Sequence, residues 1–266
     1  MGGAVRDLVL GLVPKDIDMA TNARPEIVEE LFESTTAVGR AFGTIVVSLV
    51  ADQAEHEPRS VDVELTTFRS EGVYKDGRHP DDVSYGATIE EDARRRDFTC
   101  NALYLDPLTG QVQDPEEGLK DLKMGRLHCV GDAAQRFQED GLRLMRLVRF
   151  EARYEMKATS ETLEGARASK ASLGSVSSER VLSELKGIFA AAHPARAIAR
   201  LAELELIPIA LPGFQGLLAS DETCTERLSQ LKTALESFRG QPSLAAGLAL
   251  LLEPDMNWSR EGSIYS

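Results

Sequence analysis

Two aspartates near the N-terminus, Asp16 and Asp18, are spaced so that they could act on the same metal ion. Residues i and i+2 of an extended segment point to one face. A second acidic pair, Asp62 and Glu64, lies in residues 61–66, where acidic and apolar residues alternate as in a half-buried strand. If these strands are neighbours, three or four carboxylates converge and need hard divalent cations such as Mg²⁺. The pattern predicts two-metal phosphoryl or nucleotidyl transfer.

The residues before this acidic pair could bind phosphate. Gly2 and Gly3 precede Arg6 in a run that reads as a helix start. Paired glycines let backbone N–H groups approach an anion, and a helix N-terminus favours negative charge. The alternatives are a glycine turn with a surface arginine and an Asp-x-Asp triplet that is a turn or a solvated face. The two features occur together within eighteen residues, which favours the functional interpretation.

Three consecutive arginines at residues 94–96 form the first of two basic segments. Their planar guanidinium groups could clamp a triphosphate, because each matches two phosphate oxygens at once. The alternative is a solvated helix end that pairs with Glu90, Glu91 and Asp92. The segment alone does not decide between the two.

The second basic segment, residues 139–150, reads as an amphipathic helix with Leu144, Leu147 and Val148 on its apolar stripe. Asp140 and Arg143 lie one turn apart and offer an acceptor beside a fork of donors, which could read the edge of a nucleobase. The alternative is an ordinary helix whose arginines face solvent. An exposed Asp–Arg ion pair adds little stability, so stability is a weak reason for the arrangement.

These residues sit in a chain of 266 residues with 42% hydrophobic content, enough for two or three domains. The net charge of −13 excludes a nucleic-acid binder that works by uniform basicity, so RNA contact needs local basic patches. Three scattered cysteines and four histidines show neither a disulfide framework nor metal-ligand spacing. We expect no signal peptide and no membrane span, which predicts a cytoplasmic location.

The elements that must position these residues fall into two parts. Strand patterns at 44–50, 61–68 and 102–105 alternate with helices such as 25–32, for which Asn22 is the expected cap. From about residue 132 onward, amphipathic helices predominate. The sequence therefore predicts an α+β head followed by helices. The last dozen residues read as a frayed end that only Trp258 could anchor.

Six motifs in fixed order make the chain similar to a known family. They occupy residues 2–7, 16–21, 64–69, 95–103, 139–146 and 178–185, and include Asp-Ile-Asp-Met-Ala-Thr and Arg-Arg-Asp-Phe-Thr-Cys-Asn-Ala-Leu. The order and content resemble the class II tRNA nucleotidyltransferases, or CCA-adding enzymes, and the related bacterial poly(A) polymerases.

The resemblance implies a polymerase-β-like nucleotidyltransferase head with a small mixed sheet at residues 1–127, a helical neck at 128–190 and a partial helical body at 191–266. Family heads begin with a strand and a helix before the Gly-Gly motif, so we expect an N-terminal strand to be missing. The body is expected to be shortened. Residues 70–80 resemble the mobile loop of the family, and Glu179 with Arg180 resembles the part of the neck that supports the template helix and contacts RNA.

The resemblance also implies roles for individual residues. Asp16 and Asp18 would hold two Mg²⁺ ions, with Glu64 as the third catalytic carboxylate and Asp62 ranked below it. Asp97 and Asn101 would support the sugar or the fold of their motif. Asp140 and Arg143 would pair with the base of CTP or ATP as a protein template. The other expected nucleotide-binding residues are Gly3, Arg6, Arg96, Arg146 and Arg149.

The activity implied is template-independent addition of C and A from CTP and ATP to the tRNA 3′ end, with release of pyrophosphate. The alternatives are a poly(A) polymerase acting on another RNA 3′ end, an enzyme that adds only CC or only A, and an inactive nucleotide- or RNA-binding module. A glycosyltransferase also uses Asp-x-Asp with a metal, but it would not explain the basic segments. No membrane partner is expected.

Overall fold

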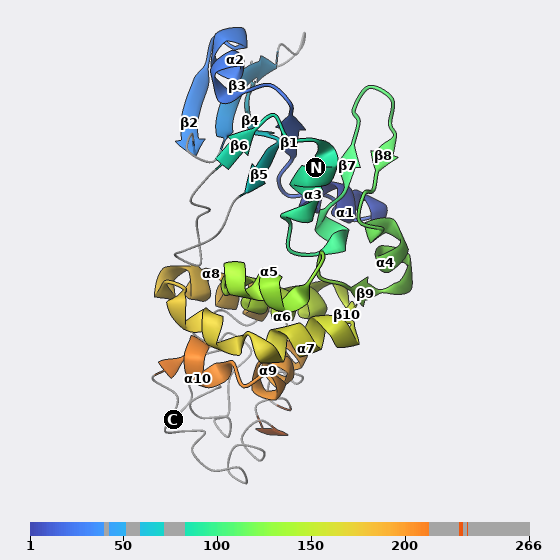
Figure 1. The fold of residues 1–266 in the computed structure, drawn as a ribbon, viewed down its shortest axis with the longest axis vertical. Helices are drawn as coiled ribbons and strands as arrows, with labels where there is room; N and C mark the ends of the chain where they lie inside the picture. The colour runs from blue at the N-terminus through green and yellow to red at the C-terminus, as the bar shows by residue number, and fades with distance from the viewer. Residues whose placement is uncertain (40–42, 52–58, 72–82, 213–228, 231–232, 234–266) are drawn as a thin grey trace. The chain divides into compact units, whose positions relative to one another are not determined.

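The computed structural model describes the chain except for residues 40–42, 52–58, 72–82, 213–228, 231–232 and 234–266 (Figure 1). The chain forms two compact units. The head unit comprises Met1–Met124 and His128–Gly131, and the helical unit comprises Gly125–Leu127 and the residues from Asp132 onward. No helix in the described part of the chain is long and apolar enough to cross a membrane.

The head is built on a four-stranded sheet of order β1-β4-β3-β2 (Figure 1). β1 runs parallel to β4, whereas β3 is antiparallel to both β2 and β4. The bounds are Asp18–Thr21 for β1, Thr35–Gly39 for β2, Thr44–Ala51 for β3 and Arg59–Thr67 for β4. The strands predicted at 44–50 and 61–68 are confirmed, because β-branched and alternating residues suit a half-buried pleated surface.

Short helices and hairpins surround this sheet. α2 starts at Pro25, so Arg24 is its N-cap, and the expected cap Asn22 is wrong. A proline fits the first helical position because its missing N–H would have no intrahelical partner there. The strand expected at 102–105 is reduced to Tyr104–Leu105. The further elements are α1 (Gly3–Val9), α2 (Pro25–Leu31), β5 (Arg69–Glu71), β6 (Val83–Tyr85), α3 (Ile89–Arg94), η2 (Thr99–Asn101), β7 (Tyr104–Leu105), β8 (Val112–Gln113) and α4 (Gly118–Met124).

Two apolar clusters hold the head together. Val28 of α2 packs on Ile45 and Val47 of β3, all three being almost fully buried. The second cluster lies beneath β1 and β7 and contains Ala93, Ala102, Tyr104 and Val130. Burial of such side chains is the main stabilising contribution to a domain of this size. The clusters fix α2 and α3 against the strands that carry the acidic residues.

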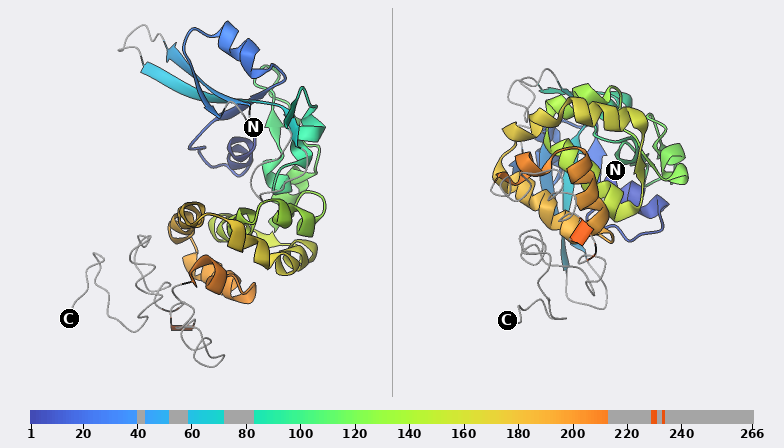
Figure 2. Two further views of the ribbon diagram at one scale, coloured as in Figure 1. Left: turned by 60° about the vertical axis from the view of Figure 1, so that its left-hand side comes forward. Right: turned by 90° about the horizontal axis from the view of Figure 1, so that it is seen from below.

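The helical unit is centred on α6, which packs against α8 and α9, while α5 packs against α7 (Figure 2). Leu144, Leu147 and Val148 of α6 are fully buried, as their spacing predicts. A short parallel pair joins β9 to β10. The bounds are β9 (Arg126–Leu127), α5 (Ala133–Glu139), α6 (Leu142–Tyr154), β10 (Lys157–Ala158), α7 (Ser160–Ala168), η3 (Lys170–Ser175), α8 (Ser178–Phe189), α9 (Pro194–Glu203) and α10 (Ile207–Ala210).

Candidate functional site

Two of the predicted carboxylates lie side by side on the head sheet. Asp18 of β1 pairs in register with Glu64 of β4, and paired residues of neighbouring parallel strands point to the same face. Asp16 lies two residues before Asp18 and is exposed, as Glu64 is. Asp62 also lies on β4, but it is opposite Ser48, whose hydroxyl donates a hydrogen bond of 2.6 Å to it. The β1–β4 register thus brings Asp18 next to Glu64 rather than next to Asp62.

The donor set fits a hard divalent cation that also binds substrate. Among the described residues, no three His, Cys, Asp or Glu side chains lie close enough to enclose a metal by themselves. The structure therefore joins two of the predicted carboxylates, not three or four. Mg²⁺ characteristically takes one or two carboxylates and completes its shell with water and substrate phosphates. Within the described part of the chain, the carboxylates of Asp16, Asp18 and Glu64 form no hydrogen bond or ion pair.

A tight turn at Gly2 leads into α1. Gly2 has φ 60° and ψ −122°, a backbone conformation that side chains other than glycine rarely adopt. Its N–H donates to the carbonyl of Leu103 at 2.8 Å, and its own carbonyl accepts from the N–H of Arg6. Gly3 is the first helical residue. The predicted Gly-Gly turn is thus anchored from both sides.

Arg6 is buried, with only 6% of its surface exposed. Its Nε and Nη2 atoms donate to Oδ1 of Asp7 at 2.8 and 2.6 Å, and its Nη1 donates to Oδ1 of Asn101 at 2.6 Å. The Asn101 amide in turn donates to Oδ1 of Asp97 at 2.9 Å. The structure therefore brings the predicted residues Arg6, Asn101 and Asp97 into one buried chain. Asp7 was missed, although its position next to Arg6 was a signal.

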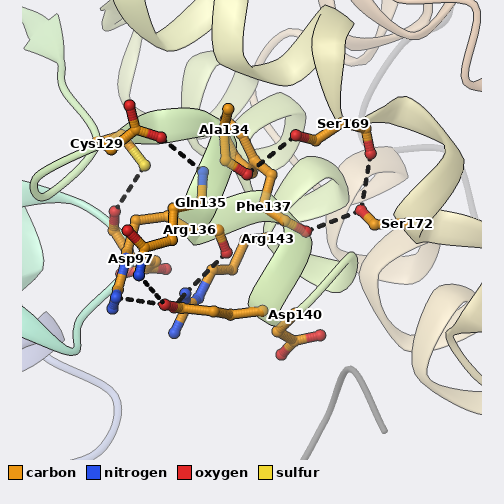
Figure 3. Close-up of polar contacts among 12 residues, drawn as sticks. Asp97, Cys129, Ala134, Gln135, Arg136, Phe137, Asp140, Arg143, Ser169 and Ser172 are labelled. Carbon is orange, nitrogen blue, oxygen red and sulfur yellow. Dashed lines mark hydrogen bonds and ion pairs between the residues drawn. The ribbon is translucent and has the colours of Figure 1, made fainter. Parts of the chain in front are cut away.

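The backbone around Asp97 is held by Cys129 and Val130, next to an isolated bridge between Phe98 and Cys129. The carbonyl of Asp97 accepts the Cys129 thiol at 3.2 Å (Figure 3). The same carbonyl accepts the N–H of Val130 at 3.1 Å. Its Oδ1 also accepts the N–H of Phe98 at 2.8 Å. These bonds leave Asp97 little freedom, so its placement beside Asn101 is a fixed feature of the head.

Arg96 lies directly beneath the turn at Gly2. Its guanidinium binds the buried carboxylate of Asp92 and the hydroxyl of Tyr104, and Nη1 donates to the carbonyl of Asn101 at 3.1 Å. Sequence reasoning considered Asp92 only as a partner of a solvated helix end and missed Tyr104. The i, i+4 spacing of Asp92 and Arg96 on a helix was the available signal.

A separate cavity of about 420 Å³ lies in the head beside β1. Its lining is mostly apolar and includes Val5, Leu8, Met19 and Phe68, with Asp18 among the few polar contributors. An apolar lining suits neither a triphosphate nor a metal ion. The carboxylates, not this cavity, are therefore the site where charge chemistry is expected.

In the helical unit, Asp140 is held by an arginine from another helix. Its two carboxylate oxygens accept Nη1 and Nη2 of Arg180 at 3.2 and 2.7 Å, and Oδ1 also accepts the N–H of Leu142 at 3.0 Å. Arg180 belongs to α8, whereas Asp140 sits between α5 and α6. This two-point contact fixes the plane of the Asp140 carboxylate.

Arg143, the second predicted template residue, is also held in place. Its Nη1 donates to Oε2 of Glu139 and to the carbonyl of Arg136, both at 2.8 Å (Figure 3). The corner between α5 and α6 is docked on η3, because Ser169 and Ser172 donate to the carbonyls of Ala134 and Phe137 (Figure 3). Glu139 was not predicted as a site residue.

Arg149 connects α6 to α8. Its Nε donates to Oε2 of Glu184 at 2.6 Å, and its aliphatic stem crosses α8 at Gly187, where a Cβ would lie 2.5 Å from Cδ of Arg149. Arg146 and Arg149 both lie over the ring of Phe150, at 5.1 and 4.7 Å from its centroid. Glu184 lies in the sixth motif, four residues after Arg180, which was the signal that could have identified it. Most of residues 70–80, the expected mobile loop, lies outside the described residues, as does Trp258.

Comparison with known proteins matches both units to family models. Residues 1–128 match the poly A polymerase head domain, and residues 155–217 match the probable RNA and SrmB-binding site of polymerase A. A CCA-adding enzyme of Streptococcus uberis is 44% identical over 191 residues, which is 72% of this chain and 45% of that protein. A CCA-adding enzyme of Bacillus pumilus is 40% identical over 215 residues, covering 81% and 51%.

A solved structure is similar over most of the chain. The crystal structure of the Bacillus stearothermophilus CCA-adding enzyme in complex with CTP has a TM-score of 0.70 and 31% identity, and the match covers 94% of this chain and 64% of that one. The chain spans about half the length of the curated relatives it matches. The α+β head with its small mixed sheet, followed by helices, is the fold that the resemblance implied.

Proposed function

Because the chain belongs to the family of the tRNA nucleotidyltransferases, or CCA-adding enzymes, and the related poly(A) polymerases, we propose that it adds C and A from CTP and ATP to the 3′ end of tRNA. One observation carries the proposal. Asp18 and Glu64 stand in register on one face of the head sheet, and no described side chain forms a hydrogen bond or ion pair with either carboxylate. Two neighbouring carboxylates of this kind can bind a divalent cation that also binds substrate phosphates.

The reaction needs divalent metal, and Mg²⁺ is the proposed ion: Asp16 and Asp18 would hold it together with substrate phosphates, with Glu64 as the third catalytic carboxylate beside Asp18. When bound, a metal of this kind lowers the pKa of the attacking hydroxyl and neutralises phosphate charge. The 3′-oxygen of the RNA forms a bond to the α-phosphorus, the bond from that phosphorus to the β-phosphate oxygen breaks, and pyrophosphate leaves. The carboxylates orient the reacting groups, and the hydroxyl proton passes to a carboxylate or to water. No covalent intermediate with the protein is required.

The head supplies the proposed phosphate and sugar contacts. Gly3 is the first residue of α1, and the buried chain of Arg6, Asn101 and Asp97 holds this segment in place. A preorganised set of donors stabilises charge without reorganising during the reaction. The support for this assignment is the burial and full hydrogen bonding of the three side chains.

The helical unit supplies the proposed base selection. Cytosine and adenine both present an amino donor beside a ring-nitrogen acceptor, whereas uracil and guanine present a carbonyl at the place of that amino group. Asp140 can accept from the amino group, and Arg143 can donate to the ring nitrogen. Arg146 and Arg149 are the proposed triphosphate contacts. Arg180 donates to Asp140, and Arg143 donates to Glu139. These hydrogen bonds support the role, because they hold the Asp140 acceptor and the Arg143 donor at fixed orientations.

The proposal is tested by incubating the purified chain with Mg²⁺, a tRNA that lacks its 3′-terminal CCA, and each labelled nucleoside triphosphate in turn. Incorporation from CTP, followed by incorporation from ATP only after CTP, is the expected result. Long A tracts on unrelated RNA would instead identify a poly(A) polymerase. Binding of CTP without incorporation would identify a nucleotide-binding module. The Asp18→Asn variant and addition of a chelator are the controls, and both should abolish incorporation.

A further inference from the structure

Asp92 is a charged side chain of the head that is neither one of the proposed catalytic carboxylates nor a proposed nucleotide contact. It lies on α3, and only 1% of its surface is exposed. Its Oδ1 accepts Nε and Nη2 of Arg95 at 2.9 and 2.6 Å, and its Oδ2 accepts Nε and Nη2 of Arg96 at 3.3 and 3.0 Å. One buried carboxylate therefore binds two guanidinium groups.

Tyr104 completes this cluster. Its hydroxyl donates to Oδ2 of Asp92 at 2.5 Å and accepts from Nε of Arg96 at 2.9 Å. The Arg96 guanidinium also lies over the Tyr104 ring, 5.0 Å from the centroid. Burial and the nearby Asp92 charge raise the pKa of the Tyr104 phenol, against the influence of Arg96, so the hydroxyl keeps its proton. A proton that points to Asp92 leaves the oxygen lone pairs for Arg96, which fixes the orientation of the guanidinium.

The charge of Asp92 is retained although the group is buried. Burial acts to raise its pKa, but the charges of Arg95 and Arg96, together with their hydrogen bonds and that of Tyr104, outweigh it and lower the pKa below the ordinary value. The carboxylate is therefore an anion at neutral pH. The carboxylate and the phenol oxygen both accept from Nε of Arg96 and are bonded to each other, so together they hold the guanidinium in one orientation.

Arg96 also packs closely against the backbone turn that precedes α1. A Cβ on Gly2 would lie 2.8 Å from Nη1 of Arg96, closer than any side chain tolerates. The same Nη1 donates to the carbonyl of Asn101, and Nη2 donates to Sδ of Met1. Every nitrogen of the Arg96 guanidinium thus has a partner within the head. The Arg96 guanidinium therefore packs against the backbone of Gly2.

Asn101 links this cluster to the second buried network. Its carbonyl accepts from Arg96, and its side-chain oxygen accepts from Arg6. The two arginines therefore bracket Asn101 and the Gly2 turn from different directions. Any shift of Arg96 would be transmitted to the first residues of α1, where the backbone is proposed to approach phosphate.

We infer that Asp92 and Tyr104 are positioning residues for the nucleotide, which seat Arg96 beneath the Gly2–Gly3 turn so that Arg96 acts on the nucleotide through this turn. The inference rests on the proposed function, because it takes the turn to be the phosphate contact. A merely structural role for the cluster would affect stability but not the affinity for nucleotide in the folded protein.

The test compares three variants of the full chain. Tyr104→Phe removes only the hydroxyl, Asp92→Asn removes the buried charge at nearly constant shape, and Glu90→Gln removes one charge from the exposed face of the same helix. The measurements are equilibrium binding of labelled CTP, KM and kcat for CTP incorporation, and thermal unfolding. Binding is measured at a temperature at which each variant is folded.

We expect Tyr104→Phe to raise the Kd and KM for CTP about threefold and Asp92→Asn to raise them about tenfold or more, by analogy with the loss of one or two charge-assisted hydrogen bonds. The kcat should change less than KM, and Glu90→Gln should match the unmodified chain. If Asp92→Asn does not fold, Tyr104→Phe decides alone. Wild-type Kd in folded Tyr104→Phe, or in folded Asp92→Asn, would overturn the inference.

Failure of the proposed function gives a different result. A chain that binds CTP but incorporates none would contradict the proposed transferase activity. The Kd values of the variants would still test whether Asp92 and Tyr104 position Arg96 for nucleotide binding. A chain that does not bind CTP at all would overturn both. The Kd series and the incorporation assay therefore distinguish the two failures.

Discussion

The acidic pair on the head sheet and the proposed template and triphosphate residues of the helical unit differ in how the protein holds their charges. In the head, Asp18 and Glu64 stand side by side on the sheet, and no described side chain forms a hydrogen bond or ion pair with either carboxylate. In the helical unit, Asp140 and Arg149 are each bonded to α8, through Arg180 and Glu184. Asp18 and Glu64 are thus available to an added cation, whereas Asp140 and Arg149 are fixed by partners within the protein.

This difference predicts which substitutions should lower activity and which should lower the free energy of unfolding. Removing a carboxylate of the head pair deletes a ligand without breaking an internal contact, so the free energy of unfolding should hardly change. Removing a paired charge leaves its partner without compensation, so stability should fall. The comparison fails if changes in the head destabilise it while changes in the helical unit affect only activity.

The largest effect is expected at the carboxylate pair. Asp18→Asn or Glu64→Gln should lower nucleotide incorporation about a thousandfold, because several kcal/mol of metal-dependent charge stabilisation are lost. The free energy of unfolding should stay within about 0.5 kcal/mol of the unmodified value. Initial rates of labelled CMP transfer and denaturant unfolding measure the two quantities.

Asp62→Asn is the matched control for this pair. Asp62 lies on the same strand but binds Ser48 and is not in register with Asp18. Its loss should change the rate by no more than a few-fold, as for surface changes away from the reacting groups. Equal losses in Asp62→Asn and Glu64→Gln would show that the β1–β4 register does not select the metal ligands.

The next largest effect is expected in the helical unit, at Glu151. Glu151 is fully buried, and its oxygens accept Nε and Nη2 of Arg200 at 2.6 and 3.1 Å and the N–H of Ala158 at 2.9 Å. Glu151→Gln should lower the free energy of unfolding by about 3–5 kcal/mol, because Arg200 loses its buried partner. Denaturant unfolding, monitored by circular dichroism, measures the change.

The exposed ion pair between Arg167 and Glu203 provides the contrast. Both side chains are about half exposed, so Arg167→Met should change the free energy of unfolding by less than about 1 kcal/mol. Losses of similar size in Arg167→Met and Glu151→Gln would mean that burial does not govern the strength of the charge pairs in this unit.

A smaller loss is expected where helices meet without room for a side chain. A Cβ on Gly141, which precedes α6, would lie 2.2 Å from the carbonyl oxygen of Ser172. Gly141→Ala should therefore cost about 1–3 kcal/mol, because backbone must move. Gly174→Ala is the control, since the nearest atom to its Cβ would be 4.0 Å away, and it should be neutral or stabilising by up to about 1 kcal/mol. Thermal unfolding of both variants checks this, and equal Tm values would contradict it.

Local pattern was sufficient for the parts of the fold that depend on neighbours along the chain. The alternation in residues 61–66 predicted β4 and placed Asp62 and Glu64 on its exposed face, and the i, i+3, i+4 spacing of Leu144, Leu147 and Val148 predicted the buried side of α6. Periodicity works here because each residue's exposure follows from the geometry of its own element. The cap of α2 was missed because Pro25 fixed the start of the helix and overrode Asn22.

Contacts between distant segments could not be predicted from pattern. The partners Asp140 and Arg180 are 40 residues apart, and Arg6 and Asn101 are 95 residues apart, with no periodicity that connects them. Tyr104 reads as an apolar strand residue, and only the fold shows that its hydroxyl reaches Asp92. Such contacts depend on how the elements pack, which a single sequence does not specify.

The smallest effect, and the sharpest test of the paired charges, concerns Arg180. Arg180→Met frees the Asp140 carboxylate from its two-point contact without removing the carboxylate itself. We expect the preference for CTP over UTP, measured as the ratio of kcat/KM values, to fall about tenfold, the effect of losing about 1.4 kcal/mol of discrimination. Lys186→Met removes one positive charge from an exposed position of the same helix and should leave the ratio unchanged. A wild-type CTP/UTP ratio in both folded Arg180→Met and Lys186→Met would show that α8 does not orient Asp140 for base selection. The comparison would then hold only for the carboxylate pair of the head.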